Sequence, residues 1–158
     1  MSVTITPLSP EEVPHLIASV ASLFVEDGGR YDAFMATEWP SEEGESYYRD
    51  LVRDEDALCL LARDEVVVGH LVGRIRRGNP LRPTARTAVL ESMRVATGRR
   101  RAGVGTALVN AFTAWARHHS ANELSVSAYA ANPMAIAFYR ARGFELFEVT
   151  SRHPLPVE

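Results

Sequence analysis

The sequence predicts a mixed α/β domain with the element order β-α-α-β-β-β-α-β-α-β. Two kinds of pattern carry this prediction. Apolar residues recur at helical spacing in four segments, and short runs of β-branched and aliphatic residues lie around them. The length of 158 residues and the hydrophobic fraction of 46% are typical of one globular domain, which we expect to span residues 1–158.

The N-terminal third begins with a strand and a capped helix. Val3 to Thr6 alternates as a short strand does. A capping serine, a first-turn proline and a capping-box glutamate then predict a helix start, and these are Ser9, Pro10 and Glu12. Apolar side chains follow at helical spacing as far as Phe24, and we expect Gly28-Gly29 to end the helix.

The middle of the chain predicts a loop, a helix and three strands. Arg30 to Pro40 is aromatic and acidic, and we expect a substrate-facing loop there, before a second helix over Glu42 to Arg53. The apolar runs Ala57 to Ala62 and Val66 to Ile75 predict an antiparallel hairpin, and Thr87 to Val95 predicts a central strand. Alternation along that strand places four side chains on one face, Val89, Glu91, Met93 and Val95.

The last third predicts two more helices and two more strands. Val104 to about His118 has the apolar spacing of a helix, and Leu124 to Ser127 reads as a short strand. Asn132 suits an N-cap and Gly143 suits a left-handed stop, so the two residues bound a further helix. Phe144 to Thr150 predicts a closing strand.

Charge is distributed unevenly along the chain. Glu26 to Glu45 holds seven acidic residues against one arginine, whereas Arg74 to Arg101 holds nine arginines against Glu91 alone. One half of the chain therefore suits a cation and the other an anion. The net charge of -3 does not indicate a nucleic-acid partner, and the 17 basic residues are all arginines, which excludes a catalytic lysine.

Cysteine usage and hydropathy indicate a cytoplasmic protein. Cys59 is the only cysteine, which excludes an intrachain disulfide and a cysteine metal cluster. The first residues do not resemble a secretion signal, and no apolar stretch reaches the length that spans a bilayer. We expect no membrane partner and no metal site.

The segment Arg100 to Thr106 is the clearest candidate binding site. A strand that enters a helix through a glycine-bearing turn leaves the first helical N–H groups unpaired, and these donors favour an anion such as a phosphate. A dinucleotide turn fits poorly, because Leu108 stands where a small residue is needed and Glu123 precedes its strand. The Walker pattern is excluded by the absence of lysine. A solvated helix entrance is the remaining alternative.

Two motifs carry a family resemblance. Arg100-x-x-Gly103-x-Gly105 follows a strand that ends in Met93-Arg94-Val95, and it resembles the acetyl-CoA signature of the GNAT superfamily of N-acyltransferases. The second family signature resembles the run Asn132-x-x-Ala135-x-x-Phe138-Tyr139-x-x-x-Gly143-Phe144. The resemblance covers about residues 57–147, and it implies a GNAT-like, mostly antiparallel central sheet flanked by helices.

The resemblance also implies a cofactor site for acetyl-CoA. The pyrophosphate would bind the turn formed by Arg100, Arg101, Ala102, Gly103, Val104, Gly105 and Thr106. Backbone groups of Met93, Arg94 and Val95 would hold the pantetheine arm as an added strand would be held, and Asn132 would reach the same arm. Tyr139 matches the family position that protonates the departing thiolate; a core tyrosine is the alternative.

The carboxylate Glu91 has two interpretations. Many family members place a glutamate here that takes the proton from the amine, often through water. An ion pair with Arg94 or Arg74 accounts for a partly buried carboxylate equally well. His70 replaces or assists Glu91, or is a structural strand histidine.

The acidic N-terminal segment also has two interpretations, a solvated face or an electrostatic funnel for a cationic amine. In the second interpretation the substrate residues are Tyr31, Glu38 and Trp39. We therefore expect transfer of an acetyl group to a primary amine of a small, cationic molecule by direct attack in a ternary complex. A non-catalytic acyl-CoA sensor and an acetyltransferase for protein N-termini or side chains remain alternatives, and a homodimer stays open.

Overall fold

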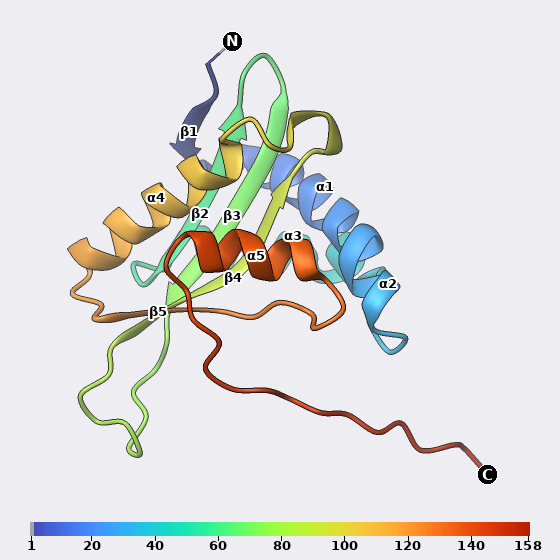
Figure 1. The fold of residues 1–158 in the computed structure, drawn as a ribbon. Helices are drawn as coiled ribbons and strands as arrows, with labels where there is room; N and C mark the ends of the chain where they lie inside the picture. The colour runs from blue at the N-terminus through green and yellow to red at the C-terminus, as the bar shows by residue number, and fades with distance from the viewer. Residues whose placement is uncertain (1) are drawn as a thin grey trace.

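A five-stranded sheet in the order β1-β2-β3-β4-β5 forms the centre of the protein, a computed structural model in which residues 2–158 are described (Figure 1). The strands are β1 Thr4–Pro7, β2 Ala57–Arg63, β3 Val67–Ile75, β4 Thr87–Val95 and β5 Glu123–Val126. The first three pairings are antiparallel and β4 pairs with β5 in parallel. The predicted mixed, mostly antiparallel sheet is therefore confirmed.

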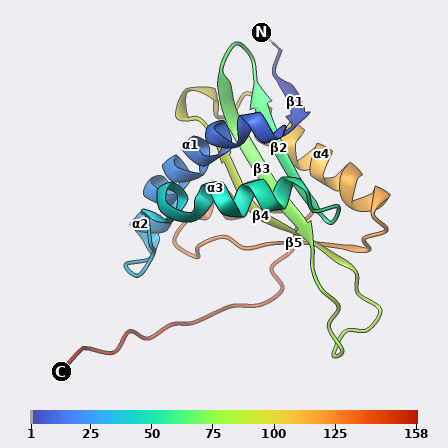
Figure 2. The same cartoon turned by 180° about the vertical axis from the view of Figure 1, so that it is seen from behind.

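Helices cover both faces of the sheet. Helices α1 (Val13–Leu23) and α3 (Trp39–Val52) lie on one face, and α4 (Val104–His118) and α5 (Pro133–Ala141) lie on the other, as the two opposite views show (Figures 1 and 2). Neighbouring residues of β2 serve different cores, because Leu60 packs with the α4 residues and Leu61 packs with α1 and α3. The sheet is thus apolar on both sides.

The helical N-terminal region runs further than the sequence predicts. The capping box is present, since Glu12 accepts from the Ser9 backbone N–H at 3.1 Å, and a 3-10 turn over Pro10–Glu12 leads into α1. Gly28-Gly29 does not end the helix, however. A π-helical turn, Phe24–Gly28, and the short α2, Gly29–Tyr31, continue it with ordinary right-handed dihedrals.

The reason for this difference lies in packing. A Cβ atom on Gly28 would meet Met35 Cγ at 2.9 Å, so the glycine is needed for close contact with Met35 and not for a left-handed stop. The π-helical turn continues α1 and contains the acidic pair Glu26 and Asp27.

A β-bulge at Glu91 changes the face pattern that alternation predicts for β4. Gly73 pairs with Leu90 and Val72 pairs with Ser92, which leaves Glu91 without a partner in β3. Val89 and Glu91 line a cavity together with residues before β2, whereas Met93 and Val95 pack against the α4 core. The prediction that these four side chains share one face is wrong, because the extra residue shifts the alternation beyond it.

The sheet opens beyond this bulge. β5 pairs with β4 only along Thr87–Leu90, and β4 continues to Val95. Within residues 2–158, the segment Glu91–Val95 therefore has a partner strand on the β3 side alone. Helix α5 crosses in front of β4 in Figure 1.

The predicted closing strand, Phe144 to Thr150, does not form. Gly143 has the predicted left-handed conformation, with φ of 95°, and the chain then leaves the domain in an extended path (Figure 1). Leu146, Phe147 and Val149 are 68%, 80% and 83% exposed. A strand needs hydrogen bonds from a neighbouring edge, and this segment has none beside it in the described part of the chain. No helix among residues 2–158 has the length and apolarity required to cross a bilayer.

Candidate active site

The turn before α4 exposes a row of backbone donors. Arg101 and Gly103 have positive φ angles, 64° and 86°, and α4 begins directly after them. The first N–H in this region that bonds a backbone carbonyl is that of Ala107, which donates to Gly103 O at 3.0 Å. Within residues 2–158, the N–H groups of residues 101–106 have no acceptor, and they lie at the positive end of the α4 dipole. Free backbone donors at a helix N-terminus are suited to an anionic group such as a phosphate.

The two glycines of this turn have different roles. A Cβ on Gly103 would meet nothing within 4 Å, so the left-handed backbone, and not a lack of space, favours glycine at this position. A Cβ on Gly105 would meet Phe138 Cζ at 3.1 Å and Val95 Cγ2 at 3.8 Å. Gly105 therefore lets α5 and the end of β4 approach the turn closely.

The side chain of Arg142 fixes α5 against the same turn. Its guanidinium donates to Thr106 Oγ1 from Nε at 3.1 Å and from Nη2 at 2.6 Å. The same group lies over the Phe138 ring, 4.1 Å from the centroid. The motif that contains the turn and the motif that contains α5 thus form one rigid corner of the molecule.

Glu26 connects the π-helical turn to β4 and to the turn before α4, residues 100–106, through hydrogen bonds. Its carboxylate accepts from Arg94 Nη2 at 2.8 Å and from Arg100 Nη2 at 3.0 Å. These hydrogen bonds, with that from Arg94 foremost, lower the pKa of Glu26 below its ordinary value. Arg100 Nε also donates to Val95 O at 2.9 Å, so the Arg100 guanidinium is occupied by protein groups. The backbone of the turn, and not this side chain, is free to meet a phosphate.

Asn132 begins α5, as predicted, and contacts the opposite side of the opening. Its Oδ1 accepts from the Ala135 N–H at 3.2 Å, which makes it the N-cap. Its Nδ2 donates to Asp27 Oδ1 at 3.3 Å. Asp27 belongs to the extension of α1 on one face of the sheet and α5 lies on the other, so these two helix ends meet where the sheet is open.

Tyr139 lies about two helical turns after Asn132 in α5. Its ring packs in an aromatic group with Phe138 and Phe144. Burial, followed by the charge of Asp27, raises the pKa of Tyr139 to about 12. No protein group in residues 2–158 hydrogen-bonds its hydroxyl. The phenol is therefore protonated at neutral pH and has a proton to donate.

Asp27 is a functional candidate that the sequence analysis missed. It belongs to the acidic segment Glu26 to Glu45, where the sequence pattern does not distinguish it from the other acidic residues. Burial raises the pKa of Asp27, partly offset by the Asn132 amide and by Arg30. The only sequence signal is its position directly before two glycines, which was interpreted as the end of a helix.

Glu91 lies in a second group of polar side chains. Arg74 Nε approaches Glu91 Oε1 at 2.5 Å, and the Tyr47 hydroxyl lies 3.5 Å from Oε2. Of the two predicted ion-pair partners, Arg74 is the one present, because Arg94 pairs with Glu26. This group borders a cavity of about 580 Å³ whose lining also includes Asp54 and Asp56.

The three predicted substrate residues do not form one group. Tyr31 packs against Tyr129, with ring centroids 5.3 Å apart. Trp39 instead packs against the rings of Phe24, Tyr47 and Tyr48, next to the Glu91 group. Glu38 is exposed and precedes α3 as its N-cap. Tyr31 is thus nearest to Asp27 along the chain, and Trp39 belongs to the group around Glu91.

His70 is fully buried between two serines. Its Nδ1 lies 2.5 Å from Ser19 Oγ in α1, and its Nε2 lies 2.7 Å from Ser92 Oγ in β4. Burial, and then the charge of Arg94, lowers the pKa of His70 to about 3. Both ring nitrogens are occupied and the ring has no exposed surface, so the structural interpretation accounts for this residue.

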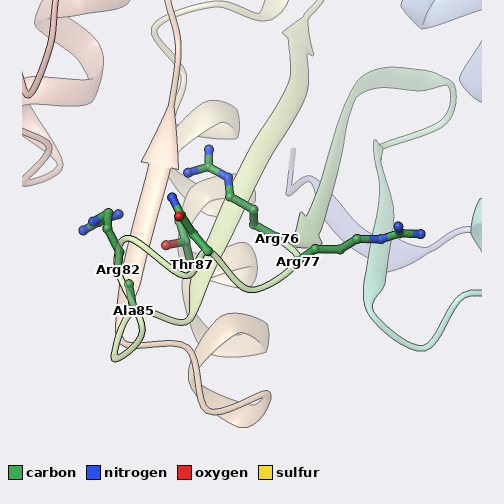
Figure 3. A pocket seen from close by; sticks show the side chains of 6 residues that line it. Arg76, Arg77, Arg82, Ala85 and Thr87 are labelled. Carbon is green, nitrogen blue, oxygen red and sulfur yellow. The ribbon is translucent and has the colours of Figure 1, made fainter.

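The arginine-rich loop between β3 and β4 borders a small hollow. The hollow there holds about 10 Å³. Arg76, Arg77 and Arg82 point in different directions around it (Figure 3). Arg82 is paired with Glu123, 2.7 Å between Nη2 and Oε2, and this pairing together with Thr87 lowers the pKa of Glu123 to about 2. Glu123 therefore serves the fold and not a ribose.

Several solved structures share this fold. AAC(6')-Ih, an aminoglycoside antibiotic 6'-N-acetyltransferase of Acinetobacter baumannii, is 23% identical over 99% of this chain and 100% of its own, with a TM-score of 0.76. A mutant of the BH1408 protein of Bacillus halodurans is 20% identical over 97% and 99%, with a TM-score of 0.85. AAC(6')-Iy, solved with the bisubstrate analogue CoA-S-monomethyl-acetylneamine, is 17% identical over 99% and 100%, with a TM-score of 0.76.

At these identities the likeness shows the fold alone. No curated protein sequence matches the chain significantly. The model of the acetyltransferase (GNAT) family, however, matches residues 21–144, which is most of the chain and includes both motifs. This protein therefore belongs to the GNAT family of acetyltransferases, and it is an N-acetyltransferase that depends on acetyl-CoA.

Proposed function

We propose that the protein transfers an acetyl group from acetyl-CoA to a primary amine of a small, cationic molecule by direct attack in a ternary complex. One observation carries this proposal. Gly105, at the start of α4 where N–H groups have no acceptor, lies close to Val95 at the unpaired edge of β4 and to Phe138, the neighbour of Tyr139 in α5. A site where these three elements meet would hold a donor and an acceptor side by side, so that no covalent enzyme intermediate is required.

The cofactor would lie along this opening. The backbone of residues 101–106 would bind the pyrophosphate, and the edge of residues 93–95, which has no partner strand on the β5 side, would hold the pantetheine arm. Val95 O already accepts from Arg100 Nε and would have to be released to bind this arm. Asn132 would take part less directly than the family resemblance implies, because its amide already bonds Ala135 and Asp27. Acetyl-CoA supplies the activated acetyl group, and the protein positions it.

Tyr139 would protonate the thiolate as the thioester breaks. Its protonated phenol supports this role. A base role for Glu91 would require a bridging water molecule or the release of its carboxylate from Arg74 and Tyr47. These two partners hold its carboxylate in the described structure, which favours the structural interpretation of Glu91.

The substrate would be a small polycation. A cationic amine is favoured by the acidic π-helical turn, which contains Asp27, and by the paired rings of Tyr31 and Tyr129. The names of AAC(6')-Ih and AAC(6')-Iy make aminoglycosides the first substrates to test. Polyamines, amino acids and protein N-termini complete the panel.

Thiol release from acetyl-CoA tests this function. Wild-type protein should release thiol only in the presence of a suitable amine, and Tyr139→Phe should lower turnover about 100-fold while cofactor binding persists. Tyr48→Phe is the matched control, because it removes a hydroxyl from a buried tyrosine of α3. Tight cofactor binding without thiol release for any amine would instead favour an acyl-CoA sensor.

We propose further that the protein is a cytoplasmic homodimer of one domain per chain. The free, buried Cys59 supports a reducing compartment. The exposed apolar side chains of Leu146, Phe147 and Val149 and the outer edge of β5, which is last in the sheet, favour pairing between two copies. Light scattering should give the mass of a dimer for the full chain and that of a monomer after truncation at residue 145. A monomeric full-length chain would contradict this proposal.

A further inference from the structure

We propose that Asp27, not Glu91, is the carboxylate that binds the acceptor amine at the reacting centre and takes its proton. This inference rests on the proposed acetyl transfer and assigns a role that neither motif contains. Its basis is the hydrogen bond of Asp27 to Asn132, the N-cap of the helix α5 that carries Tyr139.

The π-helical turn sets this position firmly. Glu26, the preceding residue, is held by Arg94 and Arg100, and Gly28, the following residue, is buried against Met35. Asp27 therefore has little freedom to move away from Asn132, whose Nδ2 lies 3.3 Å from its Oδ1. The second carboxylate oxygen of Asp27 bonds no protein group in residues 2–158 and is free for an amine.

Asp27 also acts electrostatically on Tyr139. Its charge contributes to the raised pKa of the Tyr139 phenol, and no other carboxylate does. The charged and titratable groups that face Asp27 are Arg30 and Glu26 of its own helical region, Tyr139 of α5, and Tyr129 of the loop before α5. Burial outweighs them and raises the pKa of Asp27, which makes its carboxylate a better proton acceptor near neutral pH.

Glu91 lacks these features. Both of its oxygens contact protein groups, Arg74 on one and Tyr47 on the other. Its group borders the cavity formed with Asp54 and Asp56, whereas Asp27 is hydrogen-bonded through Asn132 to α5, the helix that carries Tyr139. The base and the acid of one acetyl transfer must reach the same tetrahedral centre, and we assign these roles to Asp27 and Tyr139.

The proton balance of the reaction is complete with these two groups. The substrate ammonium gives one proton to Asp27, which passes it to solvent, and the free amine attacks the thioester carbon. As the N–C bond forms and the C–S bond breaks, the thiolate takes the proton of Tyr139. The second proton of the new amide nitrogen restores the phenol, so one proton is released for each acetyl group transferred.

Aromatic rings beside Asp27 complete a site for a cation. Tyr31 and Tyr129 pack 5.3 Å apart, and Asp32 as well as Asp27 acts on the Tyr129 phenol. Two carboxylates and two ring faces suit an alkylammonium group that carries further positive charges. Arg30 lies over Tyr31, 5.3 Å from the ring centroid, and would be displaced or shared by such a ligand.

The test compares Asp27→Asn with Glu91→Gln, with neamine and spermidine as acceptors. Asp27→Asn is isosteric and keeps an acceptor for Asn132, so folding should persist, as thermal melting would verify. We expect kcat/KM to fall about 100-fold or more in Asp27→Asn and less than about 10-fold in Glu91→Gln. The acidic limb of the pH profile of kcat/KM should disappear only in Asp27→Asn, and Asp27→Glu should recover part of the activity.

Acetyl-CoA affinity should be unchanged in all three variants. An Asp27→Asn variant that retains the rate and the acidic limb of the wild type would overturn the inference while leaving acetyl transfer intact. A wild type that acetylates no amine would overturn the proposed function instead. In that case the equilibrium affinity for neamine, measured for the wild type and for Asp27→Asn, tests whether Asp27 binds the amine. Equal affinities would refute this role.

Discussion

Lowering the pH from 6.5 to 5.0 should destabilise this protein through a single buried residue, His70. The imidazole is fully buried between Ser19 and Ser92, and its pKa is lowered to about 3 from the ordinary 6.5. Below pH 6.5 the unfolded chain binds a proton at this site and the folded chain does not. Protonation therefore favours unfolding, and stability is lost as the pH falls.

The size of this effect follows from the width of the pH window. One pH unit corresponds to about 1.4 kcal/mol for one proton, so 1.5 units cost about 2 kcal/mol. For a domain of this size that loss lowers Tm by about 4 to 8 °C. Carboxylates with lowered pKa values, such as Glu26 and Glu123, destabilise the fold only at lower pH, and the raised pKa of Asp27 acts in the opposite direction.

Chemical denaturation at pH 7.0, 6.0 and 5.0 measures this dependence. His70→Gln should be less stable than the wild type at pH 7.0, because one serine loses its partner, but its stability should change little down to pH 5.0. His118→Gln, in the exposed last turn of α4, should retain the slope of the wild type. Equal slopes for the wild type and His70→Gln would refute the buried, neutral state of His70.

Two further predictions concern the cofactor turn. Gly103→Glu should abolish acetyl-CoA binding in calorimetry, because it places a carboxylate beside the proposed pyrophosphate site. Gly103→Asn is the control and should bind, because asparagine tolerates the φ of 86°. Normal binding by Gly103→Glu would show that the turn does not hold the cofactor. Gly105→Ala should cost about 1 to 3 kcal/mol and lower turnover, since its Cβ would meet Phe138 Cζ at 3.1 Å. Phe138→Leu in the same chain should restore part of both, and unaffected turnover in Gly105→Ala would argue against a role for the contact between the turn and α5.

Local signals predicted most of the fold. The capping box at Ser9, the N-cap at Asn132 and the left-handed Gly143 each depend on residues that are neighbours in sequence, and all three are confirmed. The hairpin of β2 and β3 is likewise a local pairing. Features of this kind depend only on a few consecutive residues, so the sequence alone predicts them.

Features that depend on distant partners were not predictable in the same way. The bulge at Glu91 is a property of the register between β3 and β4, so alternation within β4 alone places Met93 and Val95 on the wrong face. Gly28-Gly29 resembles a helix stop until Met35 is placed beside it. The segment Phe144 to Thr150 has the composition of a strand, but composition does not provide an edge to pair with.

The candidate site shows the same division. The two motifs marked the turn and α5, and the structure brings them together through Gly105, Phe138 and Arg142. Asp27 lies outside both motifs and reaches Asn132 from 105 residues away in the chain. Only the hydrogen bond between the π-helical turn and the N-cap of α5 reveals it.

The most direct test of the central claim is to identify a product. After incubation of the protein with acetyl-CoA and each amine of the panel, mass spectrometry should find an amine that carries one added acetyl group, formed in proportion to the coenzyme A released. The same incubation with Tyr139→Phe should yield far less of it. If no amine is acetylated although acetyl-CoA binds, the opening between β4 and β5 is not the centre of an acetyl transfer, and the account given above is wrong.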